Sequence, residues 1–385
     1  MKILIFNFEY PPLGGGGAVA TAQIAEELAK RHTVFVLTTH YRSLAYQEVV
    51  NGVHVHRVSV WGRRSLPTAS LRSLLTFVPA ALWRGWRLCR REAFDVINAQ
   101  FVLPSGLVGV LLGTLFSVPV VVSFVGGDLF DPTKGTSPHR HAVLRWLVRA
   151  LSRRAQARTA ISRDTQQNAR TLHGVQEPIV VTPLGIFPRE VVPAQRAQLA
   201  LPERGAIFVS IGRLIPRKNY DLLLRAWARV PESQLVIIGS GPLQAKLERR
   251  IAELGLGNRV QLTGFVAEET KQQILQASQG YVSAADHEGF GLVFLEAMQA
   301  GLPIVATRRG GHTDFLRAGE NALLVEPGDA AALAQAVRRL LAEAALGRRM
   351  GEANRAAVRE FYLDKTVARF EDVLEQAVHT YANRH

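Results

Sequence analysis

The sequence is poor in cysteine and in acidic residues, and both shortages narrow what the protein can be. Cys89 is the only cysteine among 385 residues, which excludes disulfides within the chain and metal sites built from several cysteines. No carboxylate cluster suggests a metal site, so we expect neither a metal nor a cofactor. With 20% charged and 48% hydrophobic residues, the composition is that of a globular protein rather than a disordered chain.

The acid shortage is concentrated in the first half of the chain. Residues 1–190 hold 22 lysines and arginines against 11 acids, a net charge of +11, whereas the remaining residues hold 24 against 21. We therefore expect the first half to meet an anionic partner. No nucleic-acid-binding motif accompanies the charge, so nucleic acid is not expected as that partner.

The segment from Trp61 to Arg91 contains no acid at all. Leucines and the tryptophans Trp83 and Trp86 interleave with arginines at three- and four-residue spacing, which indicates an amphipathic helix. Such a helix suits the surface of an anionic membrane, or it packs on a sheet with a solvated arginine face, and the sequence favours neither. A second basic helix is expected at 142–158. The arginines of the first segment are Arg63, Arg64, Arg72, Arg84, Arg87, Arg90 and Arg91.

Long uncharged runs are also scarce. The N-terminus is a short apolar run interrupted by Asn7 and Glu9 without a cleavage site, so we interpret it as a buried strand and not a signal peptide. Only Val102–Val125 is uncharged over a length that could span a bilayer. Prolines and glycines interrupt it, which favours a buried helix followed by a parallel strand over a transmembrane helix.

The order of the segments predicts an α/β protein of two domains, the usual number for this length. Strand-like runs alternate with helical ones, which is typical of doubly wound parallel sheets. We expect an N-terminal Rossmann-like domain over 1–190, a second over 191–362, and a final helix over 363–385. The expected strands of the first domain are Lys2–Phe8, Thr33–Thr38, Val53–Val60, Val96–Ala99 and Val118–Phe124.

Two features of the first domain point to its site. A run of four glycines that includes Gly16 and Gly17 follows the first strand and precedes a helix, so a phosphate or sugar could approach the backbone closely. A dinucleotide-binding fingerprint requires glycines directly after the first strand and an acid at the end of the second strand. Here the glycines come later and the acid is missing, so dinucleotide binding is not expected. Asp128 follows the strand ending near Phe124, where an acid either faces the crevice of a doubly wound fold or only caps a turn.

The second domain carries the strongest signals. Arg213 and Lys218 follow a strand that ends at Gly212, a placement that suits a diphosphate, with exposed surface charge as the alternative. Glu288 and Glu296 stand eight positions apart across a glycine-containing loop that becomes a helix near Gly291. The loop places Glu288 before the helix and Glu296 about one and a half turns inside it. The alternative to a binding role is that Glu288 only caps the helix and Glu296 is a solvated acid on its surface.

Together these residues resemble the family 4 retaining glycosyltransferases of the GT-B fold, in which two Rossmann-like domains face each other across a cleft. The matching motifs are the glycine loop at 14–17, Gly-Arg-x-x-x-x-Lys at 212–218, Glu-x7-Glu at 288–296, Pro303 and Gly310-Gly311. The likeness covers nearly the whole chain. Where many members carry a histidine before the Gly-x-Asp of the first domain, this chain has Val125, so only Asp128 is carried over, in a supporting catalytic role.

The resemblance implies a role for each matching position. Arg213 and Lys218 would bind the donor diphosphate, Glu296 the ribose, and Glu288 the donor sugar. Gly16 and Gly17 would line the phosphate and acceptor side, and the base would lie near Gly239, Phe265 and Val266. Backbone groups around Glu288 would assist, at Gly289, Phe290, Gly291, Leu292 and Val293.

The resemblance implies a retaining, metal-independent hexosyl transfer from a UDP- or GDP-sugar to a glycan or lipid-linked acceptor. We expect a cytoplasmic enzyme, with the basic first domain as a candidate for contact with the inner membrane face. Two alternatives stay open on the same scaffold. One is an epimerase or phosphorylase, which would react without a separate sugar acceptor or with free phosphate. The other is a non-catalytic nucleotide-sugar-binding subunit.

Overall fold

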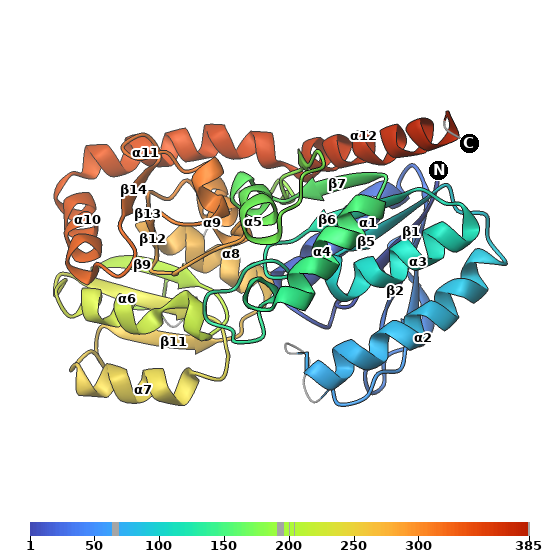
Figure 1. Cartoon of the computed structure of the whole chain (residues 1–385). Coiled ribbons are helices and arrows are strands. Elements are labelled where there is room, and N and C mark those ends of the chain that lie inside the picture. The colour runs from blue at the N-terminus through green and yellow to red at the C-terminus, as the bar shows by residue number, and fades with distance from the viewer. Residues whose placement is uncertain (64–68, 191–195, 200, 204, 384–385) are drawn as a thin grey trace. The chain divides into compact units, whose positions relative to one another are not determined.

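The computed structural model describes residues 1–63, 69–190, 196–199, 201–203 and 205–383. The chain forms two compact units (Figure 1): Met1–Gly185 together with Leu363–His385, and Ile186–Tyr362 between them. The sequence had placed the first boundary at 190 and the start of the final helix at 363. Arg64, one of the arginines of the basic segment, lies outside the described residues.

Unit 1 is built on a single sheet in which seven strands run parallel. Its order is β3-β4-β2-β1-β5-β6-β7-β8, and only the edge strand β3 is antiparallel to its neighbour. The central strands are apolar on both faces because helices cover both sides, and Ile3 to Phe6 are fully buried. The strands are β1 Lys2–Asn7, β2 Thr33–Thr39, β3 Gln47–Val50, β4 Val53–Val58, β5 Val96–Gln100, β6 Val120–Phe124, β7 Ala157–Ala160 and β8 Val180–Val181.

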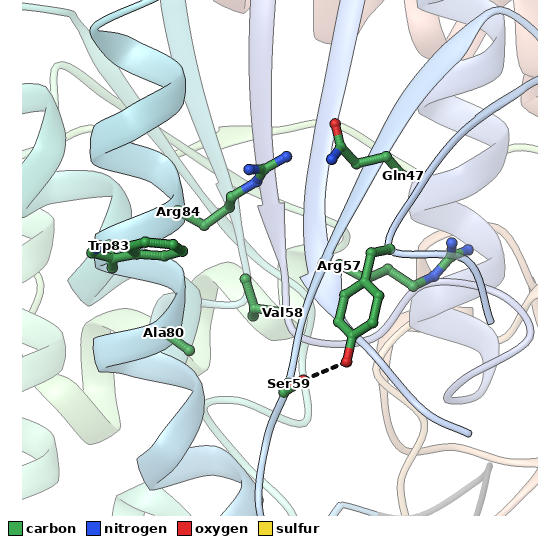
Figure 2. A pocket seen from close by; sticks show the side chains of 8 residues that line it. Gln47, Arg57, Val58, Ser59, Ala80, Trp83 and Arg84 are labelled. Atoms are coloured by element: carbon green, nitrogen blue, oxygen red, sulfur yellow. Dashed lines mark hydrogen bonds between the residues drawn. The ribbon is translucent and has the colours of Figure 1, made fainter. Parts of the chain in front are cut away.

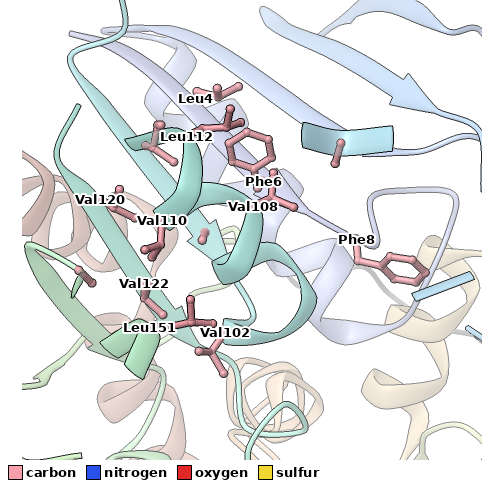
Figure 3. Packing of buried hydrophobic residues seen from close by; sticks show 14 of the residues in the cluster. Leu4, Phe6, Phe8, Val102, Val108, Val110, Leu112, Val120, Val122 and Leu151 are labelled. Atoms are coloured by element: carbon pink, nitrogen blue, oxygen red, sulfur yellow. The ribbon is translucent and has the colours of Figure 1, made fainter. Parts of the chain in front are cut away.

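Three helices, α2, α3 and α4, lie side by side on unit 1 (Figure 1). The core packs Phe6 and Leu4 of β1 against Val108 and Leu112 of α3 (Figure 3). Ser70 caps α2 by accepting a hydrogen bond from the Ser73 backbone N–H at 3.1 Å, which fixes where that helix begins. The helices are α1 Gly16–Ala29, α2 Leu71–Cys89, α3 Leu107–Phe116, α4 Ala142–Arg154, α5 Arg163–His173 and α12 Leu363–Ala382, with short turns at η1 Val102–Gly106 and η2 Pro138–Arg140.

The uncharged run Val102–Val125 forms a short turn, a ten-residue helix and strand β6, as the alternative of a buried helix plus strand predicts. Among the described residues, no helix is both long enough and apolar enough to cross a membrane.

The second basic helix is shorter than predicted. The helix expected at 142–158 ends at Arg154, and Arg158 belongs to the buried strand β7. Its guanidinium donates to the carbonyl oxygen of Ser152 at 2.9 Å and covers the end of the helix it was expected to extend. Arg158 is therefore a structural residue and not part of a basic surface.

Unit 2 repeats the architecture with a six-stranded parallel sheet of order β11-β10-β9-β12-β13-β14. Trp227 of α6 packs on Phe208 of β9 with ring centroids 5.7 Å apart, within the apolar core of this unit. The strands are β9 Ala206–Ile211, β10 Ser233–Ile238, β11 Val260–Gly264, β12 Gly280–Ser283, β13 Ile304–Thr307 and β14 Ala322–Val325. The helices are α6 Tyr220–Trp227, α7 Gln244–Glu253, α8 Glu268–Ala277, α9 Leu292–Gln299, α10 Ala330–Ala342 and α11 Ala344–Ala357, with turns η3 Arg196–Leu199, η4 Pro216–Lys218, η5 Gly311–Asp314 and η6 Val358–Phe361. The two parallel sheets with their covering helices confirm the predicted fold class.

Candidate functional site

The carboxyl ends of the parallel strands of unit 2 gather the predicted donor-binding residues. Arg213 and Lys218 follow β9, Gly239 follows β10, Phe265 follows β11, and Glu288 follows β12. Because the loops after parallel strands emerge at the same edge of a sheet, positions separated by up to seventy-five residues in sequence share one rim.

Glu288 and Lys218 form an ion pair, with the Lys218 ammonium donating to Oε1 of Glu288. The side chains are 7% and 13% exposed, so the pair is largely removed from water. Burial opposes ionisation of Glu288, but the Lys218 and Arg217 cations outweigh it and hold the pKa of this carboxyl at about 2. Glu288 is therefore ionised at neutral pH, beside the side chain of Lys218.

The backbone of Glu288 is held by the loop after β13. Its carbonyl oxygen accepts a hydrogen bond from the Gly311 N–H at 2.7 Å, and Glu288 pairs with Gly310 in an isolated β-bridge. A Cβ at Gly310 would stand 2.3 Å from that carbonyl oxygen, and the residue has a φ of +118°. Only glycine fits there, since both the close approach and the positive φ exclude a side chain.

The second carboxylate sits inside α9, which begins at Leu292 after the N-cap Gly291. Glu296 is thus one and a half turns into the helix, as predicted. Its Oε1 accepts from the Lys271 ammonium of α8 at 2.8 Å. Its Oε2 is buried and has no hydrogen-bond partner among the described residues. Burial raises the pKa of Glu296 even though Lys271 opposes the shift.

The residues between the two carboxylates present backbone rather than side chains. Phe290 is buried and packs against the Phe315 ring with centroids 5.3 Å apart. Gly289 and Gly291 have no side chain, while Leu292 and Val293 form the first turn of α9. The first N–H groups of a helix have no partner within it, so this turn can donate to an anion.

The rim is closed by contacts between the loops after β9, β10 and β11. Gly212 donates its N–H to the carbonyl oxygen of Ile238, and Gly239 donates to that of Gly264, both at 2.9 Å. The Phe265 side chain beside them is 86% exposed, and Val266 is half-buried. A flat exposed ring next to glycine backbone is a surface on which a nucleotide base could stack.

In unit 1, Gly16 and Gly17 form the start of α1. Gly16 is open on its Cβ side, whereas a Cβ at Gly17 would meet the Phe101 ring at 2.7 Å and Val125 at 3.3 Å. Gly17 thereby brings the start of α1 against the loops that follow β5 and β6.

Asp128 is buried, and its two oxygens accept backbone hydrogen bonds, from Val102 at 2.8 Å and from Val125 at 3.0 Å. Burial raises the pKa of Asp128 to about 6 against the opposing effect of these donors. The geometry assigns Asp128 the task of joining the loops after β5 and β6.

Sequence reasoning missed Lys271, Arg217 and His312. Lys271 lies on α8, and its pKa is raised by Glu296 and Glu268 although burial opposes this. His312 is fully buried, hydrogen bonds to the Thr307 carbonyl oxygen at 2.7 Å, and stacks on Phe294 of α9. Lys271 and His312 can be located in the sequence, as a lysine near the start of α8 and a histidine after Gly310-Gly311. The sequence does not show which residues they contact.

One group of described residues has the composition of a metal site, and it lies in unit 1. Ligand atoms of His32, Glu371 and Glu375 lie within 4.8 Å of one another. Both oxygens of Glu371 are already bonded, to His32 Nε2 at 2.5 Å and to the Arg31 guanidinium at 2.5 Å and 3.2 Å. The network fastens α12 to the segment that joins α1 to β2.

Two hollows lie in unit 1, beside helix α2. The larger, of about 420 Å³, lies between α2 and the strands β3 and β4 (Figure 2). A smaller one of about 160 Å³ shares Gln47 and Arg84 with it. Arg84 projects from α2 toward Gln47 (Figure 2).

Two family descriptions match the two units. Residues 15–185 match the glycosyl transferase 4-like domain, and residues 191–357 match the glycosyl transferases group 1. Among curated proteins, a GDP-mannose-dependent alpha-(1-6)-phosphatidylinositol monomannoside mannosyltransferase of Mycolicibacterium smegmatis is 31% identical over 92% of each chain. A lipopolysaccharide core biosynthesis glycosyltransferase, LpsE of Rhizobium meliloti, is 35% identical over 42% of this chain and 47% of its own, so that match spans about half of the relative.

Solved structures show the same fold. Sucrose-phosphate synthase of Thermosynechococcus elongatus superposes with a TM-score of 0.88 at 24% identity, covering 99% of this chain and 100% of that one. HepE of Anabaena in complex with UDP-glucose gives 0.78 at 21% identity, over 98% of this chain and 100% of that one. These matches, together with the two parallel-sheet units and the motifs at their strand ends, show that the chain is a glycosyltransferase of family 4 with the GT-B fold.

Proposed function

We propose that the protein transfers a hexosyl group from a UDP- or GDP-sugar to a glycan or lipid-linked acceptor, with retention of configuration and without a metal ion. The observation that carries the proposal is the pair of carboxylates at the rim of unit 2. Glu288 is held ionised beside Lys218, and Glu296 keeps a buried oxygen without a partner among the described residues. A buried, unsatisfied carboxylate oxygen is costly, so a ligand hydroxyl that donates to it gains affinity.

The names of relatives support this class of donor. The mycobacterial relative is named as GDP-mannose-dependent, and HepE was crystallised with UDP-glucose. Both molecules carry a ribose, a diphosphate and a hexose, which is the set of groups that the rim would recognise.

Each group of the donor has a matching partner in unit 2. Arg213, Lys218 and the N–H groups at the start of α9 would bind the diphosphate, and Glu296 would accept hydrogen bonds from the ribose hydroxyls. Glu288 would accept from hydroxyls of the hexose. The base would lie against Gly239, Phe265 and Val266, whose backbone and exposed ring tolerate more than one base.

In the proposed reaction the bond between the anomeric carbon and the diphosphate oxygen breaks, and the acceptor oxygen bonds to that carbon on the same face. The acceptor hydroxyl gives its proton to the departing diphosphate. The charge that develops on the diphosphate is what the protein must stabilise, and Arg213 and Lys218 would do so in place of a metal ion. Removing one such preorganised donor typically lowers the rate about 10²–10³-fold.

Unit 1 would serve the acceptor. Gly16 leaves the start of α1 open, and Asp128 would support the site by fixing the loops after β5 and β6, since Val125 offers no imidazole. We propose that the reaction takes place on the cytoplasmic side.

The test is transfer from a panel of UDP- and GDP-sugars with EDTA present, with the anomeric configuration of the product read by proton NMR. The proposal expects one donor to be used in EDTA and the product to keep the donor's configuration. A product of inverted configuration would refute the retaining mechanism, and activity that EDTA abolishes would refute metal independence. Reaction without an acceptor, or with free phosphate, would instead favour an epimerase or a phosphorylase.

A further inference from the structure

Helix α2 carries a second apolar stripe on the side that faces away from its core. Leu71, Leu75, Pro79 and Trp83 follow one another at four-residue spacing, and Trp86 continues the row. The leucines and tryptophans of this row are all exposed, with Leu75 at 65% and Trp83 at 59%. A helix that is apolar on its solvent side has more exposed apolar surface than a helix packed on a sheet needs.

Arginines flank the stripe and are held against its rings. The Arg87 guanidinium lies 4.8 Å from the centre of the Trp83 ring, and Arg90 lies 4.8 Å from that of Trp86. Within the described part of the chain, no carboxylate forms an ion pair with Arg84, Arg87 or Arg90. The positive charge of this face is therefore not neutralised by the protein itself.

The neighbouring helices α3 and α4 also carry exposed apolar side chains. Leu111 and Leu115 of α3 are exposed, as are Val143 and Trp146 of α4. The three helices contain seven arginines and no acidic residue. Exposed apolar side chains set among cations are the combination that an anionic lipid surface complements.

A hollow for an anionic group lies beside the stripe. Trp83 and Arg84 line the 420 Å³ hollow between α2 and the edge of the sheet (Figure 2), and Arg84, Arg87 and Arg91 line the smaller one next to it. Burial and the two neighbouring guanidiniums lower the pKa of Arg84, whose polar partner is His56 Nδ1 at 2.9 Å. Glu92 also lines the smaller hollow, but its carboxylate pairs with the Lys2 ammonium at 2.9 Å. Three guanidiniums that line one hollow and form no ion pair among the described residues are suited to a phosphate.

We propose that the outer face of α2 docks the protein onto an anionic lipid bilayer. The stripe from Leu71 to Trp86 enters the boundary between headgroups and acyl chains, and the flanking arginines bind lipid phosphates. Arg84 and Arg87 hold one headgroup phosphate in the smaller hollow, which both of them line. The proposal concerns where the enzyme works and does not depend on which sugar it transfers.

The experiment is co-sedimentation of the full chain with vesicles of phosphatidylcholine alone or mixed with phosphatidylglycerol, at low and high salt, with tryptophan emission recorded alongside. We expect binding only to the anionic vesicles, a blue shift of the emission, and release by salt because the charges are then screened. Trp83→Ser/Trp86→Ser should remove most of the blue shift, and Arg87→Gln/Arg90→Gln should weaken binding about 30-fold, at roughly 1 kcal/mol per charge.

The matched control is Arg348→Gln/Arg349→Gln, which removes two exposed arginines of α11 and should bind as wild type does. Circular dichroism of each variant verifies that it is folded. Failure of the wild type to bind anionic vesicles at low salt would overturn the proposal, and so would equal loss of binding in the control. Self-association in the absence of lipid that the tryptophan variant abolishes would assign the face to a second copy of the chain instead.

Discussion

At the scale of single residues, Glu288 and Lys218 act as one unit. Glu288→Gln leaves the Lys218 ammonium largely buried without its counter-ion, which should cost about 3–5 kcal/mol of unfolding free energy. The double variant Glu288→Gln/Lys218→Met removes both charges and should regain most of that stability. Neither variant should regain transfer, because both groups are proposed to contact the donor. Urea unfolding and initial rates separate the two effects, and a double variant with restored activity would contradict the proposed roles.

Asp128 gives a pH dependence of defined sign. Its pKa is about 6 in the folded protein against 3.8 ordinarily, so the unfolded chain releases the proton first as pH rises. The folded state should therefore lose about 2.5 kcal/mol of stability from Asp128 between pH 4 and pH 7. Asp128→Asn does not titrate, so the stability of wild type relative to this variant should fall across that range. A difference that stays constant or grows with pH would show that folding does not raise the pKa of this carboxyl.

At the scale of elements, the loop after β13 supports the loop that carries Glu288. Gly310→Ala should lower the free energy of unfolding by more than backbone strain alone would, since the new Cβ overlaps the Glu288 carbonyl oxygen. The matched control is Gly319→Ala, where φ is +80° and no atom lies within 4 Å of the added Cβ. We expect the control to lose about 1–3 kcal/mol of unfolding free energy and Gly310→Ala to lose a further 1–3 kcal/mol. Gly310→Ala should also bind the donor more weakly. Equal stabilities in thermal unfolding would mean that the loops do not constrain each other.

Helix α2 offers a test of which face is core. Phe77 is fully buried and packs on Phe8 with ring centroids 5.3 Å apart, whereas Leu75 is exposed. Phe77→Ala should destabilise the protein by about 3–5 kcal/mol through the cavity it leaves, and Leu75→Ala by no more than about 0.5 kcal/mol. Chemical denaturation measures both, and similar losses would contradict the assignment of the outward stripe.

The sequence predicted helices and strands well where the hydrophobic pattern and the residues that start or end an element agree. Gly291 marks the start of α9, and that start alone sets the depth of Glu296 in the helix. The edge strand β3, Gln47–Val50, was not predicted because it is short and mostly exposed. Arg158 was assigned to a helix because an arginine-rich stretch continues the pattern of α4, while its guanidinium in fact covers the end of that helix.

At the scale of the whole molecule, two parallel-sheet units follow from the alternation of strands and helices and from strand-end glycines. The pairing of side chains that belong to different elements did not follow from the sequence. Lys271 and Glu296 belong to different helices, and no local pattern indicates that they meet. The same holds for Asp128, whose burial between two backbone N–H groups depends on the loops after β5 and β6 meeting.

The central claim is that the rim of unit 2 binds a nucleotide sugar through Glu296. The most direct measurement is calorimetric titration of UDP- and GDP-sugars in EDTA into wild type, Glu296→Gln and the control Glu320→Gln, an exposed acid of the same unit. We predict saturable binding of one donor, weakened about 10- to 100-fold by Glu296→Gln because a charged hydrogen-bond acceptor is lost, and unchanged in the control. Absence of binding by any donor, or equal affinity of the two variants, would contradict the account.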